Sequence, residues 1–581
     1  MLNNKILSRK LGYGFSLDEV PSEEFDFIAS AKAELEEVVK FHPWRYIAKQ
    51  DRSIIDLDDL NERFQNDLAK SDKRLIQTFL KVQGYYKLSV DGDLGKGSRR
   101  AISDWQNATG ETTTGYLTKA QYSQILLHQQ VHGTVQQLNL PNHFSDFSRW
   151  NLNKSDLRYP SSINTAVKHQ NQLDSERKRL RDLYAKGEIT RETRSRLLHQ
   201  RFSYFPFWRD TLTRSLDNVY GQSPVFNRFW HFWINFFTIN VDACEGELFG
   251  SYYLTIRKHM TGKFEDLLYD AVWHPAMQSF LQNYDSVGPN SKRAKWMKKE
   301  GRIASINENL ARELLELFTV TPAAGYTQDD VNNVAYILTG YGELWSDDGK
   351  YSNQYFNINA NEPGHHKVMG KTYNQRPSRR LFALCKDLAR DPRTGVNIAT
   401  KLARHFISDT PPQEAIDMIA EVYNSTRGDL IKLHHAVVDA VALHSREGDK
   451  FLQPEIWFFQ VHRAVSGRLP LIFHGRNDDV NSAQINSQMF ELGHLNCRSP
   501  QPNGWSDLAV DWITPELMDR RLRYIGQLVN IGRLRQNGFN PHKYAQALFG
   551  IGSDVEYFVA EAMTYKHACI RLFCHPKFMR T

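Results

Sequence analysis

Three side chains of this 581-residue sequence are candidates for acid–base chemistry: Glu316, Glu362 and His405. Carboxylates and imidazoles are the usual general acids and bases, because protein surroundings can tune their pKa values toward neutrality. The sequence contains no glycine-rich phosphate loop, no nucleophile elbow and no HExxH zinc motif. Cys569 and Cys574 lie close together but lack a second pair of ligands, so we predict no metal site and no cofactor.

A helical hairpin over residues 305–342 is the element that the sequence indicates most strongly. Ser305 and Glu308 have the spacing of a capping box, and apolar residues then recur at helical spacing. A turn with proline and glycine follows, and Thr327 with Asp330 begins a second helix of the same kind. We therefore predict two helices joined by a tight turn.

Length predicts more than one folding unit, and helical patterns without a strand-rich region predict a mostly α protein. A chain of 581 residues exceeds the usual size of one hydrophobic core, and apolar residues make up 41% of it. We predict a large multi-helix domain with a small three-helix insert. The units are an N-terminal part of the main domain (1–69), the insert (70–128), a charged helical connector (129–200) and the main helical domain (201–581).

The hairpin segments ENLARELLELFT, GYTQDDV and LTG resemble the domain of unknown function 1800 family of bacterial proteins. Other segments resemble the same family in the same order, nearly from end to end of the chain. They are LGYGFSLDE (11–19), HPAM (274–277), SVGPNS (286–291), NEPG (361–364), ARHFISDTPP (403–412) and PQPNGWSDLAVDWITP (500–515).

The resemblance implies that an ancestral site has changed. In the family, the segment that matches WINFF (233–237) reads W-x-N-H-F, the hairpin helix reads ELLELHT and the later loop reads HEPG. Their histidines, joined by the one in ARHF, would suit a metal or acid–base site. Here the matching positions are Phe236, Phe318 and Asn361, and only His405 remains. Phenylalanine has no lone pair, so the resemblance implies a cavity filled with hydrocarbon in a non-catalytic member. If the family histidines were only buried structural residues, their loss carries no such meaning.

Residues 70–128 resemble a peptidoglycan-binding-type module, through the signature GYY…VDGDLG…RRAI…WQ…TGYLT. Tyr85, Tyr86 and Trp105 are its candidate sugar-stacking residues, although Trp105 also fits the core of the module. The turn at 91–95 lacks the glutamate that would close a calcium loop, so we predict a turn held by glycine.

An aromatic helix is predicted within residues 224–241. Arg228, His231 and Asn235 form a narrow polar stripe on it, and aromatic rings cover the rest. Such a helix is expected to be buried, and its polar stripe must then find partners inside the protein.

Charge and termini indicate partners and compartment. The net charge of +7 is small for this length, so we predict no nucleic-acid binding, and the basic stretch 174–200 is predicted to be a solvated helix pair. The weaker alternative is nucleic-acid binding through the arginine-rich helices at 175–200, which would weaken steeply with salt. No segment is long and apolar enough to span a bilayer, and the N-terminus lacks the features of a signal peptide. We expect a cytoplasmic start, with the periplasm or envelope reached through a partner.

Together these features predict a non-catalytic binding or scaffolding subunit that associates with peptidoglycan or another cell-envelope glycan. The family resemblance also implies a protein partner from the exported domain of unknown function 1501 family, whose members tend to be encoded beside this one. The alternative is an enzyme that uses Glu316, Glu362 and His405 on an envelope polymer or a protein substrate.

Overall fold

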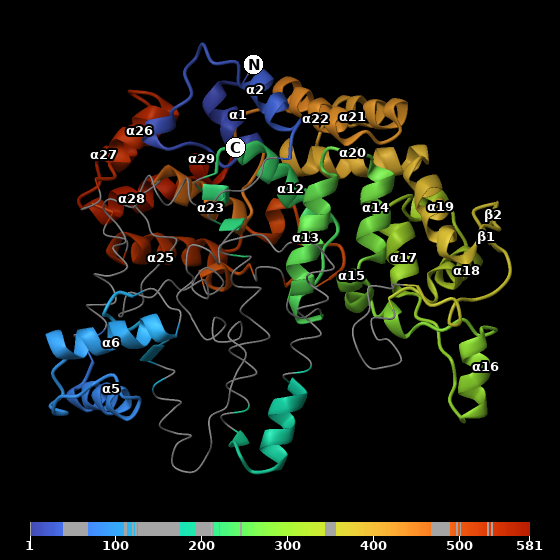
Figure 1. The fold of residues 1–581 in the computed structure, drawn as a ribbon. Helices are drawn as coiled ribbons and strands as arrows, with labels where there is room; N and C mark the ends of the chain where they lie inside the picture. The colour runs from blue at the N-terminus through green and yellow to red at the C-terminus, as the bar shows by residue number, and fades with distance from the viewer. Residues whose placement is uncertain are drawn as a thin grey trace.

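The computed structural model describes most of the chain, and Figure 1 shows its arrangement. The described residues are 2–38, 68–109, 113–118, 177–191, 221–243, 247–342, 356–465, 488–494, 498–499, 501–531 and 538–581, with isolated residues at 65, 121–122, 125, 175, 194, 211, 214–215, 217–219 and 534–535. Most of the predicted connector 129–200 lies outside these ranges.

The predicted mostly α fold is confirmed. The helices are α1 (Asn4–Leu11), α2 (Phe27–Glu34), α5 (Lys70–Val82), α6 (Lys96–Ala108), α12 (Pro224–Phe236), α13 (Glu247–His259), α14 (Phe264–Trp273), α15 (Pro275–Phe280), α16 (Lys292–Lys299), α17 (Asn309–Glu316), α18 (Gln328–Leu338), α19 (Pro377–Ala389), α20 (Pro392–Phe406), α21 (Gln413–Thr426), α22 (Leu430–His444), α23 (Pro454–Ala464), α25 (Pro515–Ile531), α26 (Pro541–Phe549), α27 (Asp554–Ala560), α28 (Tyr565–Phe573) and α29 (Pro576–Met579). Short 3-10 turns lie at Leu17–Glu19, Val241–Ala243, Asn283–Asp285, Pro322–Ala324 and Ala509–Asp511.

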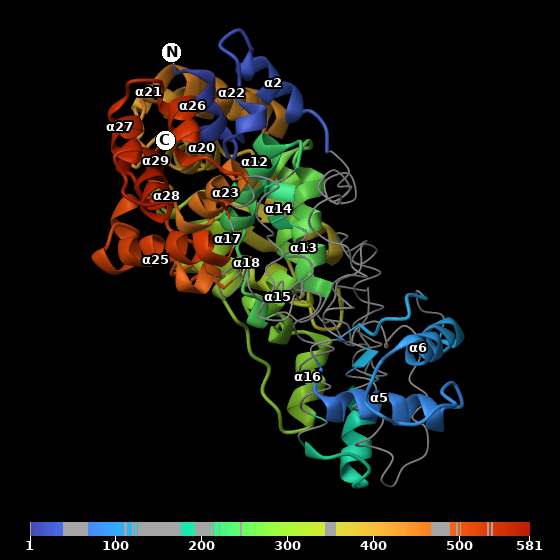
Figure 2. The same cartoon turned by 90° about the vertical axis from the view of Figure 1, so that its left-hand side faces the viewer.

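Two hydrophobic cores hold the large domain together, and the N-terminal segment contributes to both. Leu7 and Leu11 belong to the core built around α12 to α22, whereas Tyr13 and Phe15 belong to the core around α23 and α25 to α29. Figure 2 shows α1 and α2 beside α22 at one end of this domain. The segment before the insert therefore packs with helices from the far side of the sequence, while the exact boundaries at 69, 128 and 200 stay predictions.

The helical hairpin at 305–342 is present, but its first cap differs from the prediction. Thr327 and Asp330 form the predicted capping box at the start of α18. The capping box predicted for Ser305 is wrong, because α17 begins only after Glu308 and has no side-chain cap. The carbonyl of Ser305 instead accepts a hydrogen bond of 2.9 Å from the Val287 N–H, and this pairing holds the residue outside the helix.

A short β-hairpin interrupts the helices, and no sequence pattern above predicts it. Strand β1 (His366–Val368) pairs antiparallel with β2 (Lys371–Tyr373). Met369 and Gly370 both have positive φ, 46° and 85°, as the two-residue turn of such a hairpin requires. The sequence hides this element because each strand is only three residues long.

The aromatic helix α12 is buried as predicted, with only Pro224 and Asn235 outside the fully buried set. It lies between the two groups of helices in Figure 1, so its polar stripe faces the interior. Among the described residues, no helix is long and apolar enough to cross a membrane.

The module has a core of its own, formed between α5 and α6. Gln77 fixes the turn that joins these helices, since its amide oxygen accepts from the Gly92 N–H at 2.7 Å and its amide nitrogen donates to Asp91 at 2.7 Å. Gly92 has φ of 81°. The turn is thus held by glycine and a buried amide.

Candidate functional site

Two of the three positions at which the family resemblance implies a replaced histidine meet in the interior. The rings of Phe236 and Phe318 are buried with their centroids 6.1 Å apart. Lys401 of α20 covers this pair, with Nζ 4.7 Å from the centroid of Phe236 and 2.8 Å from the carbonyl oxygen of Leu317. Burial lowers the pKa of Lys401 to about 8. Hydrocarbon and one lysine therefore occupy the space between α12, α17 and α20.

Asn361, the third of these positions, belongs to a different set of contacts. Its Nδ2 donates to the carbonyl of Thr339 at 2.7 Å, and its Oδ1 accepts from Arg380 at 3.5 Å. These partners lie at the end of α18 and in α19, and neither contacts the phenylalanine pair. The amide of Asn361 therefore has hydrogen-bond partners of its own. The three positions do not meet in one pocket: Phe236 and Phe318 pack together, and Asn361 bonds to Thr339 and Arg380.

The two candidate carboxylates also have separate roles. Glu316 ends α17 and is exposed to solvent. Glu362 is buried and accepts hydrogen bonds from the Asn290 N–H at 2.9 Å and from Asn290 Nδ2 at 2.6 Å. Glu362 therefore ties the loop before α16 to the main domain, and neither carboxylate shares a hydrogen-bond partner with His405.

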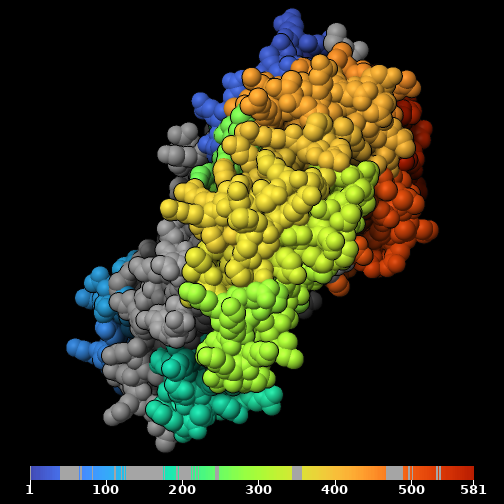
Figure 3. Space-filling model, turned by 90° about the vertical axis from the view of Figure 1, so that its right-hand side faces the viewer, coloured from blue at the N-terminus to red at the C-terminus, as the bar shows by residue number. Residues whose placement is uncertain are grey.

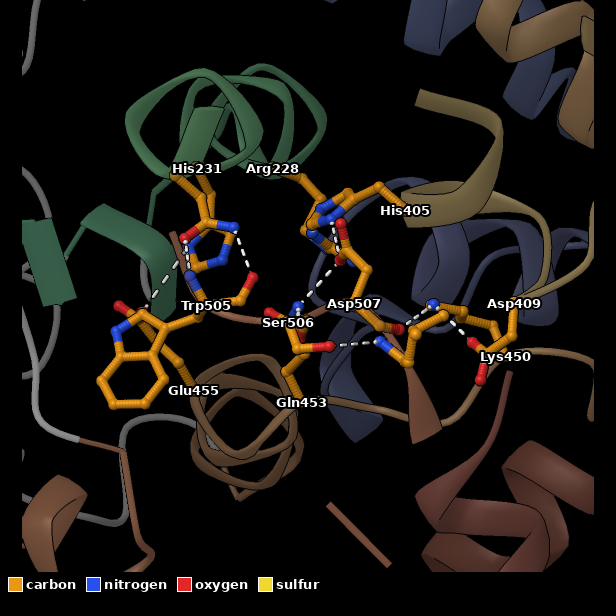
Figure 4. Close-up of polar contacts among 12 residues, drawn as sticks. Arg228, His231, His405, Asp409, Lys450, Gln453, Glu455, Trp505, Ser506 and Asp507 are labelled. Carbon is orange, nitrogen blue, oxygen red and sulfur yellow. Dashed lines mark hydrogen bonds and ion pairs between the residues drawn. The ribbon is translucent and has the colours of Figure 1, made fainter. Parts of the chain in front are cut away.

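His405 lies at the centre of a buried polar network that Figure 4 displays. Its Nδ1 is 2.6 Å from Oδ1 of Asp507, and its Nε2 contacts the guanidinium of Arg228. A guanidinium only donates hydrogen bonds, so Nε2 is the acceptor and Nδ1–H donates to Asp507. Both ring nitrogens are used, and the residue is 1% exposed.

The network continues from Asp507 to the segment before α23. Oδ1 of Asp507 also accepts from Gln453 at 2.8 Å, and its carbonyl accepts from Lys450, which pairs with Asp409 at 2.8 Å. Burial alone would raise the pKa of Asp507, but His405, Lys450 and Arg228 outweigh it and lower that pKa. Burial lowers the pKa of His405 to about 4. The ring is therefore neutral at physiological pH.

A second cluster adjoins the first on the other side of α12. Glu455 forms a buried ion pair with Arg214, and its Oε2 lies 3.8 Å from His231 Nδ1 and 3.9 Å from His494 Nε2. These groups surround a cavity of about 20 Å³, enough for one or two water molecules. Burial would raise the pKa of Glu455, but Arg214 and the two histidines lower it to about 2.

The loop with the sequence PQPNGW lines this cavity with Trp505. Asn235 of α12 donates to the carbonyl of Trp505 at 2.9 Å and accepts from the Trp505 N–H at 2.8 Å. The Trp505 ring packs on His494 with centroids 4.5 Å apart. Gly504 has φ of +79°, and a Cβ there would lie 2.4 Å from the carbonyl oxygen of Asn235. Only glycine lets the loop approach the helix this closely.

The predicted polar stripe of α12 is thus the part of the sequence that pointed to the site. Arg228, His231 and Asn235 each face a different segment of the network. Sequence patterns missed Glu455 and Asp507, because each reads as an ordinary surface acid beside a proline or a serine. Within the described residues, no group of three or more His, Cys, Asp or Glu side chains is placed to hold a metal ion.

In the module, two of the three sugar-stacking candidates are core residues. Tyr86 is 5% and Trp105 is 7% exposed, and Trp105 packs edge-on against Phe79 with centroids 5.5 Å apart. A buried ring has no free face for a sugar. Tyr85 is half-buried and packs against the edge of the same core, so it is the candidate that keeps an accessible ring.

The architecture defines a two-unit helical protein: a large domain closed around a buried polar network, and a small module with its own core. The chain belongs to the family described as Protein of unknown function (DUF1800), whose model matches residues 103–576. A second model, described as Putative peptidoglycan binding domain, matches residues 70–125. Both resemblances drawn from the sequence are confirmed. Comparison with curated proteins and with solved structures returned no match.

Proposed function

We propose that this protein is a non-catalytic binding or scaffolding subunit that associates with a cell-envelope glycan through its module. The observation that supports a non-catalytic role is the environment of His405, whose two ring nitrogens are both engaged. A general base needs a free lone pair aimed at a substrate, and a general acid needs a free proton. Asp507 and Arg228 occupy both nitrogens of this ring, and the protein covers it almost completely.

The charges around the ring support the same conclusion. Efficient acid–base catalysts have pKa values near the working pH. Here Glu455 has its pKa lowered to about 2 and His494 to about 4, so one stays ionised and the other stays neutral at physiological pH. These buried ion pairs and hydrogen bonds are those of a structural network that holds α12, α20 and α23 together.

The alternative is an enzyme, and one observation favours keeping it as a second candidate. Nδ1 of His231 and Nδ1 of His494 are buried without a hydrogen-bond partner beside the water-sized cavity. Metal analysis of the purified protein separates the two proposals. A stoichiometric transition metal that disappears in His405→Ala or His494→Ala would overturn the non-catalytic proposal, and a metal-free, folded protein is the expected result.

Glycan association rests on the module match and on the partly accessible ring of Tyr85. The test is sedimentation of the full chain with insoluble peptidoglycan. We expect Tyr85→Ala to weaken binding about tenfold, a loss of ~1.4 kcal/mol. Leu88→Ala is the matched control, because this exposed side chain of the same module offers no ring. Failure of the intact protein to sediment would contradict the glycan proposal.

A protein of the domain of unknown function 1501 family is the partner to test first, and the envelope is the compartment that this pairing implies. The support is the family membership of the chain. Co-purification of the two proteins from cells that express both, followed by fractionation, tests the partner and the compartment together. If the protein stays in the cytoplasmic fraction of cells that express both, and does not co-purify with the partner, both proposals are contradicted.

A further inference from the structure

Most of the net charge of the protein gathers on one short segment, α16 and the turn after it. Residues 292–302 contain six basic residues against one acidic residue, a net +5 out of the +7 of the whole chain. The structure presents this basic segment as a projecting helix, which Figures 1 and 2 show beyond the body of the large domain.

Helix α16 has one apolar face that packs on the large domain and one basic face that is exposed. Ala294 and Met297 face inward and form a small core with Val287 and Ala360. Lys292, Lys295, Lys298 and Lys299 are exposed on the remaining surface, as is Arg302 in the turn that follows. None of these five cations forms an ion pair or a side-chain hydrogen bond with another described residue. Within the described part of the chain, this charge is therefore not neutralised by ion pairs.

Two exposed apolar side chains accompany the cations. Trp296 is 52% exposed and Ile303 is 90% exposed. The positions 292, 295, 296 and 299 follow the i, i+3, i+4, i+7 spacing, so the tryptophan lies between lysines on one face of the helix. In Figure 3 this segment, in green, lies in the lower part of the displayed face.

Hydrogen bonds fix the start of α16 to the large domain and close the turn that follows the helix. The Ser291 hydroxyl caps α16 by accepting from the Ala294 N–H at 3.1 Å, and the Arg293 N–H donates to the carbonyl of Asn359 at 2.8 Å. After the helix, the Arg302 N–H donates to the carbonyl of Met297 at 2.8 Å. The cations and the tryptophan are thus presented in a fixed arrangement, which lowers the entropy that a partner must remove on binding.

We propose that α16 and its following turn dock on an anionic phospholipid surface. Lysines are attracted to anionic headgroups, and tryptophan prefers the boundary between headgroups and acyl chains. Ile303 decides between lipid and other polyanions, because a bilayer offers an apolar phase to an isoleucine and a polysaccharide or a nucleic-acid backbone does not. The inference is independent of the glycan association proposed for the module.

The test is co-sedimentation of the full chain with vesicles of phosphatidylcholine and phosphatidylglycerol in equal parts, and with vesicles of phosphatidylcholine alone. We expect binding to the anionic vesicles only. The triple variant Lys295→Gln, Lys298→Gln, Lys299→Gln should bind about 100-fold more weakly, since each lysine near such a surface contributes about fivefold. Trp296→Ala should also weaken binding, although it leaves the charge unchanged.

The matched control is Lys432→Gln, Lys543→Gln, Lys566→Gln, which removes the same charge from exposed positions in three other helices. We expect this control to bind vesicles like the unmodified protein. The proposal is overturned if the unmodified protein does not bind anionic vesicles, or if the two triple variants lose equal affinity. It is also overturned if Trp296→Ala keeps its affinity for vesicles and the protein binds duplex DNA tightly. Circular dichroism verifies that the variants fold, and sedimentation with peptidoglycan should be the same for all of them.

Discussion

The Nδ1 atom of His405 lies 2.6 Å from Oδ1 of Asp507, although 102 positions separate the two residues in the sequence. This contact joins α20 to the loop before α25 and orients the ring so that its other nitrogen accepts from Arg228. The buried imidazole therefore links three segments through hydrogen bonds: α20, the loop before α25 and α12.

Replacing Asp507 by asparagine should destabilise the protein without changing its shape. The substitution removes the negative charge that compensates Arg228 and Lys450 and disturbs the His405 hydrogen bond. We expect the free energy of unfolding to fall by about 2–3 kcal/mol. This is less than the loss for a fully buried ion pair, because solvent reaches part of the aspartate and screens its charge.

Denaturant unfolding measures this loss. The control is Asp511→Asn, an exposed aspartate a few residues along the same loop, which should change stability by less than about 0.5 kcal/mol. If the two variants unfold alike, the network does not stabilise the domain.

Buried neutral histidines should make the protein less stable in mild acid. Burial lowers the pKa of His434 and His462 to about 3 and of His494 to about 4. Unfolded histidine titrates near about 6.5. Below that pH the unfolded chain binds more protons than the folded one, so the free energy of unfolding falls as the pH falls toward the folded-state values.

The free energy of unfolding should fall by about 1 kcal/mol for each buried histidine at a pH one unit below the unfolded-state pKa. Urea titrations between about pH 7.5 and 5.5 would measure it. His494→Gln should reduce the fall by the share of one histidine, whereas His567→Gln, at an exposed position, should leave it unchanged. Equal slopes for all three proteins would show that His494 is not held neutral.

Restoring a histidine at position 318 should be costly. Phe318 is fully buried against Phe236 and Phe237, with centroid distances of 6.1 and 5.1 Å. Phe318→His removes apolar burial and adds two polar atoms without partners, a loss of about 3 kcal/mol. Phe318→Leu keeps the site apolar and should lose about half as much. A histidine variant as stable as the natural protein would mean that a polar pocket persists there.

Gly504→Ala should separate close packing from backbone strain. An added Cβ would meet the carbonyl oxygen of Asn235 at 2.4 Å in a residue whose φ is +79°. We expect a loss of about 3 kcal/mol or more, because backbone atoms of both segments would have to move. Gly325→Ala is the control: its φ of +70° and ψ of 27° are left-handed helical, and nothing lies within 4 Å of an added Cβ. It should show the conformational cost alone, about 1 kcal/mol.

Thermal or urea unfolding of the two glycine variants, measured side by side, provides the comparison. A difference of less than about 0.5 kcal/mol between them would mean that the loop is not pressed against α12 in solution.

The sequence by itself determined the local features of this protein. Helical spacing and the Thr327 cap identified the hairpin, the aromatic helix was expected to bury Arg228, His231 and Asn235, and the family resemblance was correct. These features depend on neighbours a few residues apart, which periodicity records. The Ser305 cap failed because a distant residue, Val287, uses its carbonyl group.

Only the tertiary structure decided which groups meet. Glu455 pairs with Arg214 across 241 positions, His405 pairs with Asp507, and Asn361 is held by α18 and α19 apart from the phenylalanine pair. The same holds for α16, whose lysines are ordinary in sequence and become a concentrated patch because the fold buries only Ala294 and Met297. The physical reason is that partner choice and exposure follow from how helices pack, and helical periodicity specifies one face of a helix without specifying what covers it.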